Sequence, residues 1–183
     1  VLGLHGDLSG HLVDPSRLVD VARGLRAEVD ALPAVPRMRG PYYQEVRDAL
    51  AVQDARAQLV PLVEAFRSLK SANEVVDFGD QAELAAQLAV EFPEVGAGER
   101  ERFAVVLLDE YQDTSHAQLV LLRALFGGGH PVTAVGDPCQ SIYGWRGASA
   151  GTLTAFRREF RARTGVDAGQ SALTTSFRNG ERI

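Results

Sequence analysis

Two short apolar runs, each followed by polar and acidic residues, constrain the fold of this 183-residue chain most strongly. They occupy residues 104–108 and 131–135, and an amphipathic stretch at 115–126 and three glycines at 127–129 lie between them. Continuous apolar runs of this length are typical of strands that are buried on both faces of a parallel sheet. Strand, helix and strand within about 32 residues predict a βαβ unit. The fold class expected is therefore α/β.

The first 74 residues predict helices and carry little chemistry. Apolar residues recur at helical spacing from about 15 to 32 and from about 43 to 72, and the proline-rich segment 33–43 separates the two patterns. Pro61 is expected to kink the second helix or to divide it in two. We therefore expect residues 1–74 to form a mainly helical subdomain.

Residues 75–183 are expected to form the α/β part. Asp80 and Glu83 have the spacing of a capping box, which marks the start of a helix. The other expected elements are a helix reaching about residue 92, a charged loop at 93–102, a loop at 136–148, a helix at 151–163 and a possible strand at 172–175.

The charge is distributed unevenly along the chain. Residues 75–115 carry two arginines and ten acidic residues, net −8, whereas residues 116–183 carry eight arginines and four acidic residues, net +4. A metal site beside a polyanion site would give this pattern, and so would two solvated surfaces. The single cysteine, Cys139, allows no internal disulfide, and no signal sequence or membrane-spanning run is visible. We expect a cytoplasmic protein with no membrane partner.

The residues that directly follow the two apolar runs are candidates for chemistry, because ligands of open parallel sheets bind at the carboxyl ends of strands. Asp109 and Glu110 follow the first run, and the segment 136–141 follows the second. Two adjacent acids can divide a phosphoryl-transfer task, one binding Mg²⁺ and the other taking a proton from water. Alternatively, a residue within 113–115 caps the next helix and the acids only favour its dipole.

Three segments resemble motifs II, III and IV of the UvrD, PcrA and Rep family of superfamily 1 DNA helicases, in the family's order and approximate spacing. They are VVLLDEYQDTSHAQ at 105–118, VTAVGDPCQSIYGWRGA at 132–148 and LTTSFRN at 173–179. More weakly, VVDFGDQAEL at 75–84 resembles the family's VDFDDL segment, with Gly79 in place of an acid. The resemblance implies part of a RecA-like parallel sheet flanked by helices. It also implies that residues 1–74 are part of the helical subdomain inserted into the family's first RecA-like domain.

The same resemblance implies an ATP site with Mg²⁺. Asp109 would coordinate the Mg²⁺ of MgATP, and Glu110 would activate the hydrolytic water. Gln140 would contact the γ-phosphate, and Arg178 would place its guanidinium on the same phosphate. Phe177 occupies the position of the family's adenine-stacking tyrosine and lacks its hydroxyl group.

A DNA contact is expected in the loop 136–148. Tyr143 and Trp145 flank a glycine, and bases of single-stranded DNA stack on exposed aromatic rings for about 1–3 kcal/mol each. The alternative is that both rings pack beneath the loop. Arg146 would either contact phosphate or anchor the loop by an ion pair.

A phosphate-binding loop with its lysine is missing, because the only lysine of the chain, Lys70, follows no glycine-rich segment. The family's second RecA-like domain is also missing. The sequence therefore predicts a fragment, inactive alone, of an ATP-dependent 3′-to-5′ helicase that acts on single-stranded DNA and duplex junctions in repair, recombination or replication. The alternative is a non-catalytic module, derived from such a helicase, that binds DNA or a partner.

Overall fold

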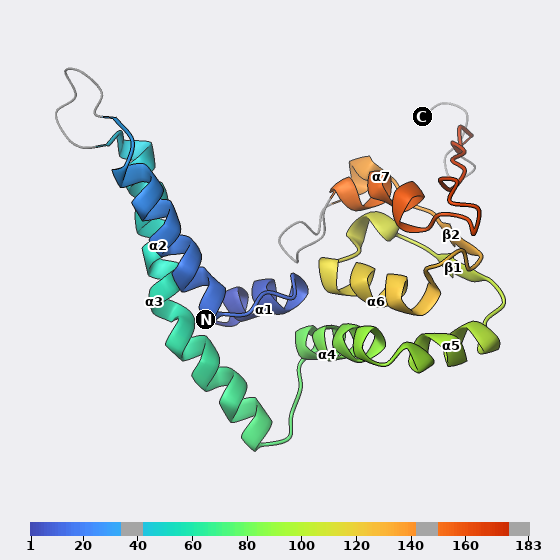
Figure 1. Cartoon of the computed structure of the whole chain (residues 1–183), viewed down its shortest axis with the longest axis horizontal. Helices are drawn as coiled ribbons and strands as arrows, with labels where there is room; N and C mark the ends of the chain where they lie inside the picture. Colours follow the sequence, from blue (N-terminus) through green and yellow to red (C-terminus); the bar gives the residue numbers. More distant parts are fainter. Residues whose placement is uncertain (34–41, 142–149, 176–183) are drawn as a thin grey trace, which may run out of the picture.

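The computed structural model describes residues 1–33, 42–141 and 150–175, and it combines a long helical hairpin with a small α/β part (Figure 1). No helix within these three ranges is both long and apolar enough to cross a membrane. In chain order the elements are α1 (Leu2–Gly10), α2 (Ser16–Asp30), α3 (Gln44–Ala72), α4 (Phe78–Glu91), α5 (Pro93–Arg102), β1 (Val106–Leu108), the 3₁₀ turn η1 (Tyr111–Asp113), α6 (His116–Phe126), β2 (Val132–Ala134), the 3₁₀ turn η2 (Pro138–Gln140) and α7 (Ala150–Glu159).

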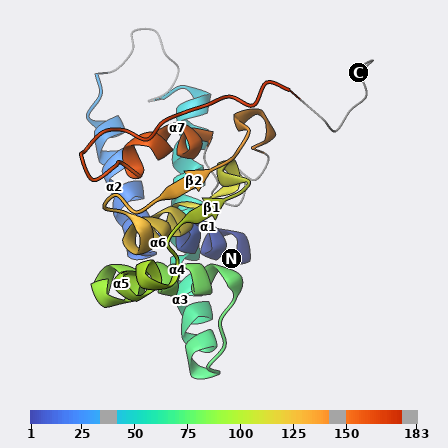
Figure 2. The same cartoon turned by 90° about the vertical axis from the view of Figure 1, so that its right-hand side faces the viewer.

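The predicted βαβ unit is confirmed. Strands β1 and β2 pair in parallel, with Val106 opposite Val132 and Leu108 opposite Ala134, and α6 connects them. Each strand is three residues long, shorter than the apolar run that predicted it. Helices α6 and α7 both pack against the same core as the two strands, and α4 and α5 lie below α6 in Figure 2. The α/β class is therefore confirmed, on a small sheet of two strands within the described ranges.

One face of this sheet packs on an aromatic core and the other is open. The core consists of Tyr111, Phe156 and Phe160, with the two phenylalanine rings stacked at 4.9 Å and Tyr111 edge-on to Phe156 at 5.2 Å. Burial, reinforced by the nearby carboxylate of Glu159, raises the pKa of the Tyr111 hydroxyl to about 12. On the opposite face Leu107, at the centre of β1, is 76% exposed. This alternation follows from the two-residue period of a strand.

Helix α3 is a single continuous helix, although Pro61 was expected to kink it or to divide it in two. Helix α3 runs through Pro61 without interruption. A proline removes one backbone hydrogen bond, but Val60 and Val63 on either side of it are buried, and their packing favours the continuous helix. Helix α1 was not predicted, because its repeated glycines lower helix propensity. Burial of Leu8, and of His5 in a polar cluster, compensates.

The polar cluster joins α1, α3 and the start of α4. The ammonium group of Lys70 lies 2.7 Å from His5 Nε2, 2.7 Å from Asp77 Oδ2 and 2.5 Å from Asp80 Oδ2. Asp77 and Asp80 also form the capping box of α4, which corrects the predicted pair Asp80 and Glu83. The imidazole and the two carboxylates have the arrangement of metal ligands. Lys70 already supplies a positive charge among them, so the cluster is an ion-pair network.

Three further sequence predictions are corrected. The expected loop at 93–102 is helix α5, which starts with Pro93 at its first position and packs on α6. The packing is close: a Cβ on Gly96 would lie 2.6 Å from the carbonyl oxygen of Ala124, so only glycine fits. Helix α7 ends at Glu159 rather than near residue 163, and residues 172–175 form no strand in the structure.

Candidate functional site

The candidate site lies where the chain leaves the two strands. Glu110 and its neighbour Asp109 follow β1, and the segment 136–141 follows β2. The parallel ladder continues past the strands, because the Tyr111 amide donates to the carbonyl of Val135 at 3.0 Å. As predicted, the structure therefore brings the two polar segments together at one edge of the sheet.

The two adjacent acids have different surroundings. Asp109 Oδ1 accepts a hydrogen bond from the Glu110 amide at 2.9 Å, and Glu110 Oε2 accepts one from Gln112 Nε2 at 2.7 Å. Both side chains are exposed. Glu110 has φ 51° and ψ 37°, a left-handed conformation that costs a non-glycine residue about 1–2 kcal/mol. The turn thus leaves the two exposed carboxylates with different hydrogen-bond partners.

The second segment holds Gln140 beside Asp137 in the turn η2. Gln140 Nε2 donates to Asp137 Oδ2 at 2.8 Å, and the amide of Cys139 donates to Asp137 Oδ1 at 2.9 Å. These hydrogen bonds lower the pKa of the Asp137 carboxyl, and the one from Gln140 has the larger effect. The Gln140 side chain is exposed, so it is accessible to a ligand.

The helix cap expected within residues 113–115 is formed by Ser115. Ser115 Oγ accepts from the Gln118 amide at 3.3 Å, and Gln118 Oε1 accepts from the Ser115 amide at 2.9 Å. This reciprocal pair is the capping box of α6. The carboxylates of Asp109 and Glu110 form their hydrogen bonds outside this cap.

Sequence reasoning missed Gln112, which connects the two segments. Its amide contacts Glu110 on one side, and on the other it accepts a hydrogen bond from the amide of Asp137 at 3.0 Å. The side chain is 1% exposed. The only signal in the sequence was a polar residue two positions after the acid pair, and that signal does not distinguish a buried amide from a solvated one.

The remaining predicted site residues lie outside the described ranges. They are Tyr143, Trp145 and Arg146, predicted to contact DNA, and Phe177 and Arg178, predicted to contact the nucleotide. Their roles stay predictions.

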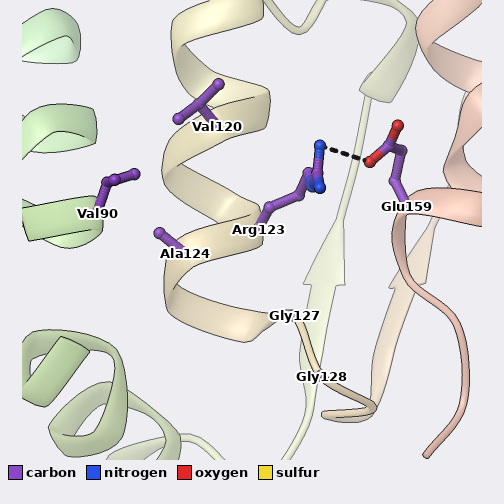
Figure 3. A pocket seen from close by; sticks show the side chains of 7 residues that line it. All are labelled: Val90, Val120, Arg123, Ala124, Gly127, Gly128 and Glu159. Atoms are coloured by element: carbon purple, nitrogen blue, oxygen red, sulfur yellow. Dashed lines mark ion pairs between the residues drawn. The ribbon is translucent and has the colours of Figure 1, made fainter.

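A pocket of about 320 Å³ lies between α4, α6 and α7, and it is separate from the candidate site (Figure 3). Val90, Val120 and Ala124 contribute apolar surface, and an ion pair of 2.8 Å joins Arg123 to Glu159 at its border. None of the residues at the strand ends lines it. The pocket therefore adds nothing to the chemistry of the site.

Comparison with known proteins identifies the family. The family model of the UvrD/REP helicase N-terminal domain matches residues 42–161, which include Asp109, Glu110 and Gln140. This chain belongs to the UvrD/REP helicase family. The resemblance drawn from the sequence motifs is thereby confirmed.

Individual helicases of the UvrD/REP family match a little over half of the chain. DNA helicase II of Rickettsia typhi is 38% identical over 101 residues, which are 55% of this chain and 15% of that protein. The ATP-dependent DNA helicase UvrD1 of Mycobacterium tuberculosis is 41% identical over 113 residues, 58% of this chain and 14% of that protein. DNA helicase II of Escherichia coli is 37% identical over 102 residues, 56% of this chain and 14% of that protein. The matched part thus covers only about a seventh of each relative.

Proposed function

We propose that this chain is part of an ATP-dependent DNA helicase and that its strand-end site binds and hydrolyses MgATP. One observation carries the proposal. Asp109 and Glu110 lie beside the segment 136–141, which contains Gln140, at the carboxyl ends of two parallel strands. The names of the relatives, DNA helicase II and ATP-dependent DNA helicase UvrD1, support it. The complete protein would couple hydrolysis to 3′-to-5′ movement on single-stranded DNA in repair, recombination or replication.

The donor chemistry of the site suits Mg²⁺ and a triphosphate. Asp109 is exposed, and its Oδ2 atom has no hydrogen-bond partner among the described residues, so it is free to bind a hard cation. A bound Mg²⁺ would neutralise charge on the phosphate oxygens. Glu110 would take the proton of the attacking water, and Gln140, together with Arg178, would contact the γ-phosphate. Phe177 would stack on adenine.

The DNA contact is proposed for the residues that directly follow Gln140. Tyr143 and Trp145 would stack on bases, and Arg146 would contact phosphate or anchor the loop. Only a few residues separate Gln140 from Trp145 in the chain, so one short segment would contact both ligands. The partners are single-stranded DNA and duplex junctions, in a cytoplasmic protein.

The open sheet face is a surface that we expect to be covered in the complete protein. Val105, Leu107 and Val135 are exposed apolar side chains on or beside the two strands, and such surface is normally covered. We propose that residues 75–183 belong to a RecA-like domain whose other strands come from elsewhere in the protein, and that residues 1–74 belong to an inserted helical subdomain. Lys70 is held in its ion-pair network, so we propose that another lysine of the complete protein binds the phosphates.

The metal role of Asp109 can be tested in the full-length protein by Asp109→Asn. An amide is a poorer ligand for Mg²⁺ than a carboxylate, so we expect the Mg²⁺-dependent affinity for ATP to fall by about tenfold or more. Titration with a fluorescent ATP analogue, with and without Mg²⁺, measures it. Asp20→Asn, at an exposed carboxylate on α2, is the matched control and should bind normally. Unchanged Mg²⁺-dependent binding by Asp109→Asn would contradict the assignment.

A further inference from the structure

Gln112 uses both ends of its side-chain amide in the interior of the site. The Nε2 group donates to Glu110 Oε2 at 2.7 Å, and Oε1 accepts from the backbone amide of Asp137 at 3.0 Å. An ionised carboxylate can only accept, and a backbone N–H can only donate, so the two partners allow a single orientation of the amide. The residue is 1% exposed, and water does not compete for either bond.

The hydrogen bonds continue from Gln112 to the second strand end. The backbone amide of Asp137 donates to Gln112. The side-chain Oδ2 atom of Asp137 accepts a hydrogen bond from Gln140 Nε2 at 2.8 Å. Ser141 Oγ also donates to the backbone oxygen of Gln112 at 3.3 Å. A contiguous chain of contacts therefore links the carboxylate after β1 to the glutamine after β2.

Gly136 leaves the space that this arrangement needs. A Cβ at position 136 would lie 2.5 Å from Gln112 Oε1 and 3.2 Å from the Gln112 backbone nitrogen. Any side chain there would displace the Gln112 amide from its bond to Asp137. The absence of a side chain at Gly136 thus allows the loop to approach the buried Gln112 amide closely.

We propose that Gln112 is a positioning residue that holds the Glu110 carboxylate and links its orientation to the segment 136–141. The proposal rests on the proposed function, because it takes Glu110 as the base. Glu110 is exposed on a left-handed turn, and without Gln112 its carboxylate would be free to change rotamer. A movement of Gln140 on contact with phosphate would shift Asp137, and Gln112 would carry that shift to Glu110.

The test is Gln112→Met in the full-length protein. Methionine fills a similar volume but provides neither hydrogen bond, so the base loses its orientation while the phosphate contacts remain. We expect kcat for ATP hydrolysis to fall about 100-fold with KM for ATP nearly unchanged. Gln112→Leu, which also provides neither hydrogen bond but fills the space with a branched apolar side chain, should show the same loss of kcat. The second variant covers the case in which methionine disturbs folding.

Two comparisons separate positioning from general structural damage. Gln118→Met removes the capping partner of Ser115 and should lower the thermal midpoint while leaving kcat unchanged. In a Glu110→Gln background, Gln112→Met should cause no further loss of single-turnover hydrolysis, because no base remains to be positioned. A normal kcat in both Gln112 variants, or the same 100-fold loss in the Glu110→Gln background, overturns the proposal.

The same set of variants separates this proposal from the proposed function. If Glu110→Gln alone lowers turnover by the expected factor of about 10² to 10⁴ while the Gln112 variants hydrolyse ATP normally, only the positioning role fails. If Glu110→Gln itself hydrolyses ATP normally, the assignment of the base has failed, and the role of Gln112 fails with it.

Discussion

Glu110→Gln in the full-length protein is expected to lower ATP turnover by about 10²- to 10⁴-fold while nucleotide binding stays nearly unchanged. The amide has the shape of the carboxylate, and its oxygen can still accept the hydrogen bond of Gln112 Nε2. The left-handed turn and the neighbouring Asp109 are therefore preserved, and only the proton acceptor is lost. Single-turnover hydrolysis, measured beside equilibrium binding of ATP, separates the two effects.

Glu101→Gln is the matched control for this prediction. Glu101 lies near the end of α5, is exposed, and belongs to no contact of the site. Its variant should hydrolyse ATP at the normal rate. Near-normal turnover by Glu110→Gln would show that another group takes the proton, whereas a parallel loss of ATP binding would show that Glu110 holds the nucleotide rather than activating water.

The second large effect is expected from Lys70→Met, which should lower the free energy of unfolding by about 3–5 kcal/mol. The ammonium group is 2.7 Å from Asp77 Oδ2 and 2.5 Å from Asp80 Oδ2, and Lys70 is 9% exposed. Methionine fills the space but removes the ammonium group shared by the two carboxylates, leaving the His5 imidazole, 3.3 Å from Asp77 Oδ2 and 3.2 Å from Asp80 Oδ1, as the basic group beside them. Chemical denaturation at neutral pH measures the loss.

The free energy of unfolding lost in Lys70→Met should be smaller at acidic pH. Burial raises the pKa of Asp77, but the hydrogen bond from Lys70 and that from the Asp80 amide outweigh burial and lower it to about 2. The folded pKa lies below the unfolded value, so this contribution is complete above about pH 4 and is lost as the pH falls through about 2. Because the Asp77 side chain is 44% exposed, solvent screening limits the contribution of Asp77 to the free energy of unfolding to about 1 kcal/mol.

An exposed ion pair provides the control for Lys70. Arg26 on α2 pairs with Asp54 on α3, and both side chains are at least 40% exposed. Arg26→Met should cost no more than about 1 kcal/mol, with little dependence on acid. If Lys70→Met were as mild as Arg26→Met, the polar cluster would not hold α1, α3 and α4 together.

The sequence could predict those features that depend on local pattern. The apolar runs before Asp109 and Gly136 predicted the parallel pair, and the helix expected from Ser115 begins there. The position of the acids at the strand end followed from the same pattern. These features depend on residues that are close in the chain, so periodicity and turn chemistry are sufficient to find them.

Features that depend on distant residues could not be predicted in this way. Helix α5 is stabilised by packing of Gly96 on α6, and the capping box of α4 starts at Asp77 because Lys70 binds both of its acids. The role of Gln112 likewise depends on an amide 25 residues away, on Asp137. A sequence pattern gives the residue types that form such contacts, but it does not show which residues lie close together in the folded chain.

The central claim, that the strand-end site hydrolyses ATP in a DNA-dependent motor, is tested most directly by ATP turnover of the purified full-length protein. We predict Mg²⁺-dependent hydrolysis that rises on addition of single-stranded DNA toward about 10 s⁻¹, a typical enzyme rate, and that falls by about 10²- to 10⁴-fold in Glu110→Gln. A folded full-length protein that binds single-stranded DNA and MgATP but hydrolyses no ATP would contradict the account.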